Sequence, residues 1–271
     1  MLLSIQASTL CQSVGTKIAL ITRALWRKEM FTLYGLPSLG RLRQPSPWVM
    51  KVELALHTLG LEYVVENIPP SRIATFGPTG KVPFLVSEGI SLNESERIVG
   101  AIELYDELKR YPQPADQNDK DGIAFVRLVE DHFYSIICHS KYENRDSSSC
   151  MFAELFPYLP TPATRFIANS VAAIMKRRLS GTSIGGLTDA EIAHEAAKDI
   201  AALSGQLSGN GFIASTRLTV YDFTVAAHIA AIFFWPFDNW LTLLLREDRV
   251  FREYLERVAH AVGGFEYETS L

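Results

Sequence analysis

Three short polar blocks in the N-terminal half hold the side chains that could do chemistry. Ser46-Pro47 stands where a helix should begin, with the serine as N-cap and the proline as the first helical residue. Lys81-Val82-Pro83 leads into a strand, and Glu94-Ser95 begins the next helix directly after a strand. Free backbone N–H groups at such a helix start bind anions such as a carboxylate. We therefore expect an anion site at Glu94-Ser95.

The elements that position these blocks follow from the apolar pattern. Residues 31–35 and 61–68 predict two strands, and residues 47–59 between them carry apolar side chains at helical spacing. Residues 82–92 predict an antiparallel hairpin, and residues 94–108 predict a further helix. The order is βαβ followed by ββα. Such a sheet brings all three blocks to one edge, which favours a ligand site over an ordinary strand-starting proline and a plain helix cap.

Residues 30–108 resemble the N-terminal domain of glutathione transferases, and the rest of the chain resembles their all-helical C-terminal domain. The resemblance rests on the three blocks and on the order of the elements. It implies the glutathione transferase architecture, in which a thioredoxin-like α/β domain is followed by an all-α domain. We expect these domains at residues 30–110 and 122–271, joined by a linker at residues 111–121.

The resemblance also implies a glutathione site, with glutathione as co-substrate. The glutathione-binding residues would be Lys81, Val82, Pro83, Glu94 and Ser95. In the superfamily the backbone at the Val82 position pairs with the cysteinyl part, and the Glu94-Ser95 pair holds the γ-glutamyl end. Because the corresponding proline of thioredoxin-like domains follows a cis bond, we expect a cis Val82–Pro83 peptide.

Ser46 stands at the position that the superfamily fills with its catalytic serine or cysteine. A hydroxyl at a helix N-terminus can donate a hydrogen bond to the glutathione sulfur, and the helix dipole also favours the thiolate. Since the thiolate is the nucleophile, bound glutathione would then attack electrophiles near neutral pH. Tyr34 is the rival catalytic candidate, because other glutathione transferases use a tyrosine near the end of the first strand. A plain N-cap is the alternative role for Ser46.

A finer resemblance is to the failed-axon-connections and metaxin-like branch of the superfamily. It rests on an insertion at residues 36–45, on the block at residues 46–53, and on the runs at residues 181–185 and 198–203. Relatives in this branch often have a cysteine three residues after the serine, where this chain has Val49. The substitution argues against a dithiol redox mechanism.

The composition is that of a globular protein with sizeable cores. The 271 residues are 48% hydrophobic and 21% charged. The net charge is −4, so the chain lacks the excess of basic residues that is typical of nucleic-acid-binding proteins. Cys11, Cys138 and Cys150 lack paired or metal-like spacing and suit a reducing compartment. The histidines show no HExxH pattern, so we expect no metal.

The C-terminal half predicts helices at residues 122–138, 164–178, 189–207 and 220–233. Thr219 and Asp222 form an N-capping box, which in glutathione transferases nucleates a buried core helix, so we assign both residues to folding. A pocket for a small hydrophobic electrophile should lie between the domains. Its candidate lining residues are His132, Phe133, Tyr134 and Trp235, although aromatic residues on amphipathic helices usually pack in the core.

Residues 1–29 lie outside the expected fold, and residues 1–28 contain basic residues but no acid. A mitochondrial transit peptide, a membrane-associating helix and upstream sequence ahead of a start at Met30 are the alternatives. The position of Met30 directly before the first strand favours the last of these. We expect a cytoplasmic protein, with mitochondrial association as the alternative that metaxin-like relatives suggest.

Two classes of function fit the sequence. The first is a detoxifying enzyme that transfers glutathione to a hydrophobic electrophile, as the homodimer expected of the family. The second is a non-catalytic, metaxin-like adaptor for protein interaction. The intact blocks at residues 81–83 and 94–95 favour the enzyme, whereas the insertion at residues 36–45 leaves room for the adaptor. Glu96-Arg97 could contact a partner subunit or form a solvated face.

Overall fold

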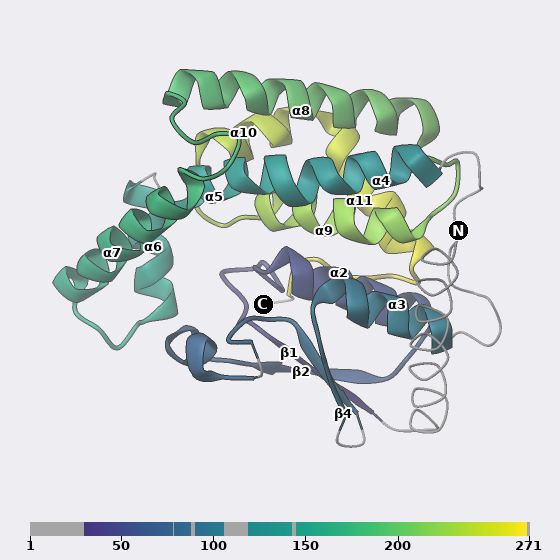
Figure 1. Cartoon of the computed structure of the whole chain (residues 1–271), viewed down its shortest axis with the longest axis horizontal. Coiled ribbons are helices and arrows are strands. Elements are labelled where there is room, and N and C mark those ends of the chain that lie inside the picture. The colour runs from purple at the N-terminus through teal and green to yellow at the C-terminus, as the bar shows by residue number, and fades with distance from the viewer. Residues whose placement is uncertain (1–29, 78, 88–89, 106–118, 143–144, 270–271) are drawn as a thin grey trace, which may run out of the picture.

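The computed structural model describes residues 30–269 except residues 78, 88–89, 106–118 and 143–144. The expected N-terminal extension and most of the expected linker lie outside the described residues. A four-stranded sheet forms one side of the molecule, and layers of helices lie above it (Figure 1). Among the described helices, none is long and apolar enough to cross a membrane.

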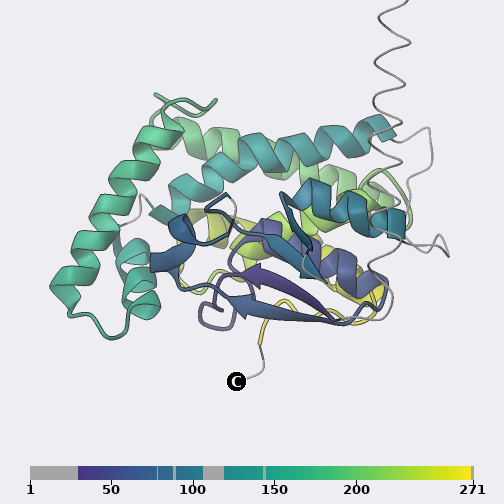
Figure 2. The ribbon, with the colours of Figure 1, turned by 60° about the horizontal axis from the view of Figure 1, so that its bottom comes forward.

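The sheet has the strand order β2-β1-β3-β4 (Figure 2). Its strands are β1 (Phe31–Gly35), β2 (Tyr63–Asn67), β3 (Phe84–Ser87) and β4 (Ile90–Asn93). Strands β1 and β2 run parallel because α2 (Pro47–Thr58) connects them, whereas β3 and β4 form an antiparallel hairpin beside β1. The short 3₁₀ helix η1 (Pro70–Thr75) follows β2, and α3 (Ser95–Tyr105) follows β4. This is the predicted thioredoxin-like arrangement.

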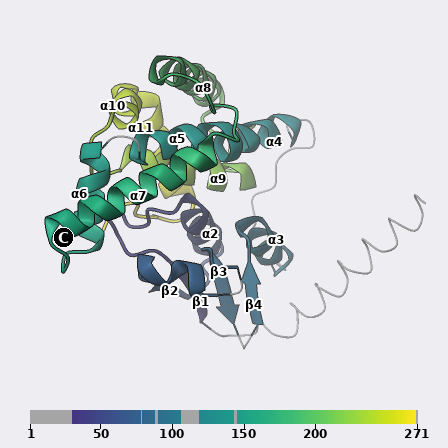
Figure 3. The same ribbon diagram turned by 60° about the vertical axis from the view of Figure 1, so that its left-hand side comes forward.

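The rest of the chain is helical, as predicted. It contains α4 (Asp119–Arg127), the π-helical segment η3 (Leu128–Phe133), α5 (Tyr134–Tyr142), α6 (Arg145–Leu155), α7 (Thr161–Leu179), α8 (Asp189–Asn210), α9 (Val220–Phe233), α10 (Trp240–Glu247) and α11 (Arg249–Ala261). Helices α6 and α7 stand at one end of the molecule, and α8 covers the outside (Figures 1 and 3).

The predicted helix at residues 122–138 is the succession of α4, η3 and α5, with a π-helical turn in its middle. Helices α6, α10 and α11 were not predicted. The serine run in α6 hides its helical pattern, because serine competes with the backbone for hydrogen bonds and is a weak helix former.

Helix α2 is the centre of the molecule, because it is buried between the sheet and α9. Most of its residues are buried, including the charged Lys51 and Glu53, each with only 1% of its surface exposed. The Glu53 carboxylate accepts hydrogen bonds from Arg43 Nε at 3.0 Å and from the Tyr63 hydroxyl at 3.3 Å. Burial raises the pKa of Glu53, and the Arg43 charge opposes that rise.

Lys51 joins three elements through two ion pairs. Its ammonium lies 2.5 Å from the Glu96 carboxylate in the first turn of α3 and 3.0 Å from the Glu130 carboxylate in η3. Glu96, one of the two residues considered for contact with a partner subunit, therefore forms an ion pair within its own chain. The contact holds the start of α3, the middle of α2 and the helical layer at fixed positions relative to one another.

The Thr219–Asp222 box begins α9 as predicted. The Asp222 carboxylate, fully buried, accepts hydrogen bonds from the Thr219 backbone at 2.7 Å, the Thr219 hydroxyl at 2.9 Å and the Ile213 backbone at 2.9 Å. The Tyr254 hydroxyl from α11 donates a fourth, at 2.9 Å. The box thus also ties α11 to the start of the core helix.

Replacing Asp222 by alanine should destabilise the fold strongly. The Asp222→Ala variant leaves buried donors without an acceptor, and we expect a loss of about 3–5 kcal/mol in the free energy of unfolding. Urea denaturation measures it. The exposed Asp131→Ala variant is the control and should change the same quantity by less than about 0.5 kcal/mol. A loss of Asp222→Ala as small as that of the control would contradict the structural role of the box.

Replacing Lys51 by methionine should leave the half-buried Glu130 carboxylate with the exposed Arg127, 3.6 Å away, as its remaining cation. The expected loss in unfolding free energy is about 2–3 kcal/mol, below the usual cost of breaking a fully buried pair because Glu96 is well exposed. Lys198→Met is the matched control, since Lys198 pairs with Glu195 on the surface and should contribute less than about 1 kcal/mol. Equal losses in the two variants would show that Lys51 does not join the layers.

Candidate active site

A cavity of about 640 Å³ lies between the sheet edge and the helical layer. The sequence-predicted residues that line it are Ser46, Lys81, Val82, Pro83, Glu94 and Ser95. Three separate blocks of the chain thus meet at one cavity, at the edge where they were expected. Its size is in the range of pockets that hold small-molecule ligands.

Ser46 is the N-cap residue of α2, but its side chain does not cap the helix. Its backbone is extended, with φ −90° and ψ 114°, and its side chain makes no cap hydrogen bond. The Ser46 backbone N–H instead donates to Gln44 Oε1 at 3.1 Å. The half-buried hydroxyl at the cavity wall is therefore available to a ligand near the positive end of the helix dipole.

The Val82–Pro83 peptide bond is cis, which confirms the prediction. The described ladders of β3 begin at Phe84, so Val82 lies just beyond the paired part of the strand. Gly80, with φ +64°, makes the preceding turn, and a Cβ there would lie 2.8 Å from the Ala74 carbonyl oxygen. The turn brings Lys81, whose side chain is exposed, and Val82 to the cavity mouth.

Glu94 and Ser95 form the turn from β4 into α3. Glu94 has φ +69°, a left-handed conformation that is uncommon for a residue other than glycine and costs about 1–3 kcal/mol. The Glu94 carbonyl accepts from the Ile98 N–H at 3.0 Å, which makes Glu94 the cap of α3. Ser95 is buried at the first helical position. The start of α3, with the free backbone N–H groups of its first turn, thus borders the cavity, as an anion site requires.

The insertion at residues 36–45 is a packed wall of the cavity. Leu39 and Leu42 are buried, and the Gln44 amide bonds the Leu36 backbone. The C-terminal segment holds the insertion from outside, because the Arg43 N–H donates to the Tyr267 carbonyl at 2.9 Å. The Thr269 N–H likewise donates to the Arg41 carbonyl at 2.8 Å.

The opposite wall comes from the helical layer. One face of α5 contributes Tyr134, Ile137, Cys138, Lys141 and Tyr142, whose spacing places them along one side of the helix. The Trp48 ring from α2 meets the Tyr134 ring edge-on, with the centroids 4.2 Å apart. Further lining residues are Met151, Phe152, Leu155, Val171, Arg178 and Trp235. This half of the cavity is mostly apolar.

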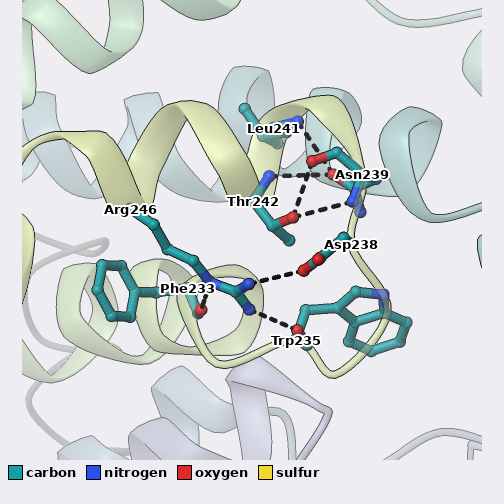
Figure 4. Close-up of polar contacts among 7 residues, drawn as sticks. All are labelled: Phe233, Trp235, Asp238, Asn239, Leu241, Thr242 and Arg246. Atoms are coloured by element: carbon teal, nitrogen blue, oxygen red, sulfur yellow. Dashed lines mark hydrogen bonds and ion pairs between the residues drawn. The ribbon is translucent and has the colours of Figure 1, made fainter.

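Trp235 is fixed by the turn that follows α9 (Figure 4). The Arg246 guanidinium donates to the Phe233 carbonyl at 2.8 Å and to the Trp235 carbonyl at 2.7 Å, and it pairs with Asp238 at 2.7 Å. Asn239 then caps α10 through the N–H groups of its first turn. The turn is therefore held at both ends, and the Trp235 ring has a defined place in the wall.

Burial sets the protonation of the α5 side chains. It raises the pKa of the Cys138 thiol to about 11, so this thiol is protonated and not a nucleophile near neutral pH. Burial also raises the pKa of Tyr134 and lowers that of Lys141, in the latter case to about 7. Lys141 is thus the group on this wall that titrates near neutrality.

The other candidate residues lie away from the cavity. Tyr34 stacks on Phe84, with the ring centroids 4.2 Å apart, and is not among the cavity-lining residues. His132 Nδ1 lies 2.6 Å from Asp199 Oδ2 on α8, and Phe133 is buried in the core. The sequence reasoning missed Lys141, although its position seven residues after Tyr134 places both on one helical face.

Within the described part of the chain, no three His, Cys, Asp or Glu side chains are grouped so that they could hold a metal ion. The lining residues instead provide backbone N–H groups, a serine hydroxyl, cations and aromatic rings. That donor set suits an anionic ligand with an apolar part.

The chain is similar to known proteins in its sequence. Residues 44–107 match the family model of the glutathione S-transferase N-terminal domain. The chain is 24% identical over 237 residues to an isoprene-epoxide glutathione S-transferase from Rhodococcus sp. (strain AD45), covering 84% of this chain and 98% of that protein.

Solved structures show the same fold. A glutathione transferase from Phanerochaete chrysosporium superposes with a TM-score of 0.59 at 14% identity, covering 89% of this chain and all of the other (100%). A Bombyx mori glutathione transferase gives a TM-score of 0.52 at 16% identity, covering 86% of this chain and 89% of the other. The fold is therefore that of glutathione transferases.

Proposed function

We propose that this chain is a glutathione transferase-like enzyme that binds glutathione at the sheet edge and activates its thiolate. The observation that carries the proposal is that one cavity gathers Ser46, the Lys81-Val82-Pro83 block and the Glu94-Ser95 block. The γ-glutamyl carboxylate would bind the N–H groups at the start of α3, and the cysteinyl backbone would pair with Val82. The sulfur would then lie beside Ser46.

Ser46 would stabilise the thiolate without being a nucleophile itself. Its hydroxyl is not used to cap α2, which supports a role toward a ligand over the plain N-cap. A hydrogen bond to the sulfur, together with the N-terminal end of α2, would lower the pKa of the bound thiol. Tyr34 is the weaker catalytic candidate because its ring packs against Phe76 and Phe84 and does not line the cavity.

The second substrate would be a small hydrophobic electrophile. The apolar half of the cavity, with Trp48, Tyr134, Phe152 and Trp235 in its walls, supports this substrate class. The curated relative is named for an epoxide substrate, so epoxides are the first electrophiles to test.

Several finer features remain proposals. We propose domains at residues 30–110 and 122–271, a homodimer, a cytoplasmic location, a role in detoxification and a place in the metaxin-like branch. The insertion at residues 36–45 does not support the alternative function as a non-catalytic adaptor. It is packed into the cavity wall and held by the C-terminal segment.

Calorimetric titration of the full chain with glutathione tests the ligand site. We expect saturable binding, and at least a tenfold loss of affinity in the Glu94→Ala/Ser95→Ala variant, since that variant disturbs the anion site. The Glu62→Ala/Ser91→Ala variant is the matched control, because both side chains are exposed and neither lines the cavity. Absence of binding by the unmodified chain would contradict the proposed function.

The Ser46→Ala variant tests the activation of the thiol. We expect the pKa of bound glutathione to rise and kcat with an electrophile to fall by about tenfold or more, because one hydrogen bond to the thiolate is lost. Ultraviolet absorbance of the thiolate against pH measures the first effect. Tyr34→Phe should leave both quantities unchanged. A normal kcat in Ser46→Ala with a reduced one in Tyr34→Phe would transfer the role to Tyr34.

A further inference from the structure

Lys141 is a buried cation on the apolar wall of the cavity. Its ammonium donates to the Ala231 carbonyl of α9 at 2.9 Å and lies 3.7 Å from the centroid of the Trp235 ring. Within the described residues, no carboxylate forms an ion pair with it. One carbonyl and one ring face leave part of its donor capacity unused, and the side chain also lines the cavity.

The groups around Lys141 supply no negative charge. Its own helix presents the Cys138 thiol and the Tyr142 phenol, both with a pKa raised by burial and hence protonated at neutral pH. Helix α9 presents His228, which burial keeps neutral by lowering its pKa to about 3, and α7 presents the cationic Arg178. A buried ammonium without an anionic partner is costly, and this one stays only partly satisfied.

A second donor at the same end of the cavity points to the same ligand chemistry. The Trp235 indole Nε1 is buried and has no hydrogen-bond partner among the described residues. Trp235 is held in the cavity wall by Arg246 (Figure 4). The apolar half of the cavity thus ends in two donors that are not fully satisfied, the Lys141 ammonium and the Trp235 indole, which suits a substrate oxygen that becomes negative.

We propose that Lys141 is a proton donor to the oxygen of the electrophile, and that the cavity takes apolar electrophiles whose leaving atom is oxygen, such as epoxides. This inference rests on the proposed glutathione chemistry. The thiolate attacks an epoxide carbon, the C–S bond forms, and the C–O bond breaks with its electron pair going to oxygen. The Lys141 ammonium gives that oxygen a proton, which yields the alcohol, and the amine regains a proton from solvent.

Lys141 can also change its protonation state near neutral pH. Burial lowers its pKa to about 7, near the value at which a group can act as an acid at neutral pH. Since only the ammonium donates, the rate on an epoxide should rise with pH as the thiol ionises and fall as pH passes through the pKa of Lys141. An electrophile that expels chloride needs no proton, so its rate should show the rise alone.

Paired kinetics with styrene oxide and chlorodinitrobenzene test the proposal. In Lys141→Met, which keeps an unbranched side chain against Trp235, kcat on styrene oxide should fall about a hundredfold, and the falling limb of its pH profile should disappear. The rate on chlorodinitrobenzene should fall far less. Lys176→Met, which alters an exposed lysine of α7 outside the cavity, should leave both substrates unaffected. Equal losses on both substrates in Lys141→Met would overturn the proposal.

A binding measurement decides the question without turnover. The full chain should bind a hydroxyalkyl conjugate of glutathione about five- to tenfold more tightly than the matching alkyl conjugate, because Lys141 contacts the hydroxyl. Lys141→Met should lose this preference while retaining its affinity for glutathione. An equal preference in both proteins would overturn the role of Lys141 and leave the glutathione site intact. No binding of either conjugate or of glutathione would overturn the proposed function itself.

Discussion

The relative positions of the sheet domain and the helical layer depend on the two ion pairs of the buried Lys51 ammonium. It lies in the middle of α2 and pairs with Glu96 at the start of α3 and with Glu130 in the π-helical segment. The N-terminus of α2 carries Ser46, and the start of α3 carries Ser95. One cation thus fixes both ligand-facing helix ends relative to the helical layer.

The cavity walls are likewise held in place by contacts between segments that are far apart in the sequence. Its floor is the sheet edge, and its walls are an insertion held by the C-terminal segment and a helical face that Trp48 contacts. Arg246 holds the turn that carries Trp235. Each wall is therefore secured by a segment distant in the sequence. The result places a hydroxyl and free N–H groups at one end, and aromatic rings with the Lys141 cation at the other.

Most of the thioredoxin-like half could be predicted from the sequence because its signals are local. Ser46-Pro47 marks a helix start, and the Thr219–Asp222 box marks another; both helices begin where expected. Tyr134 and Trp235 were candidate lining residues from the sequence, and both line the cavity. Lys141 and the rest of the helical wall could not be predicted, because the partners of Lys51 and Lys141 depend on how the layers pack. Tyr34 and His132 illustrate the same point, because both are residue types that often act in catalysis. In the structure Tyr34 stacks on Phe84 and His132 pairs with Asp199, and neither lines the cavity.

The central claim is that glutathione binds at this sheet edge with its sulfur beside Ser46. A crystal structure of the full chain soaked with glutathione tests it most directly. We predict the γ-glutamyl carboxylate on the backbone N–H groups at the start of α3, the cysteinyl backbone paired with Val82, and the sulfur within hydrogen-bond distance of the Ser46 hydroxyl. Glutathione bound outside this cavity, or with its sulfur turned away from Ser46, would contradict the claim.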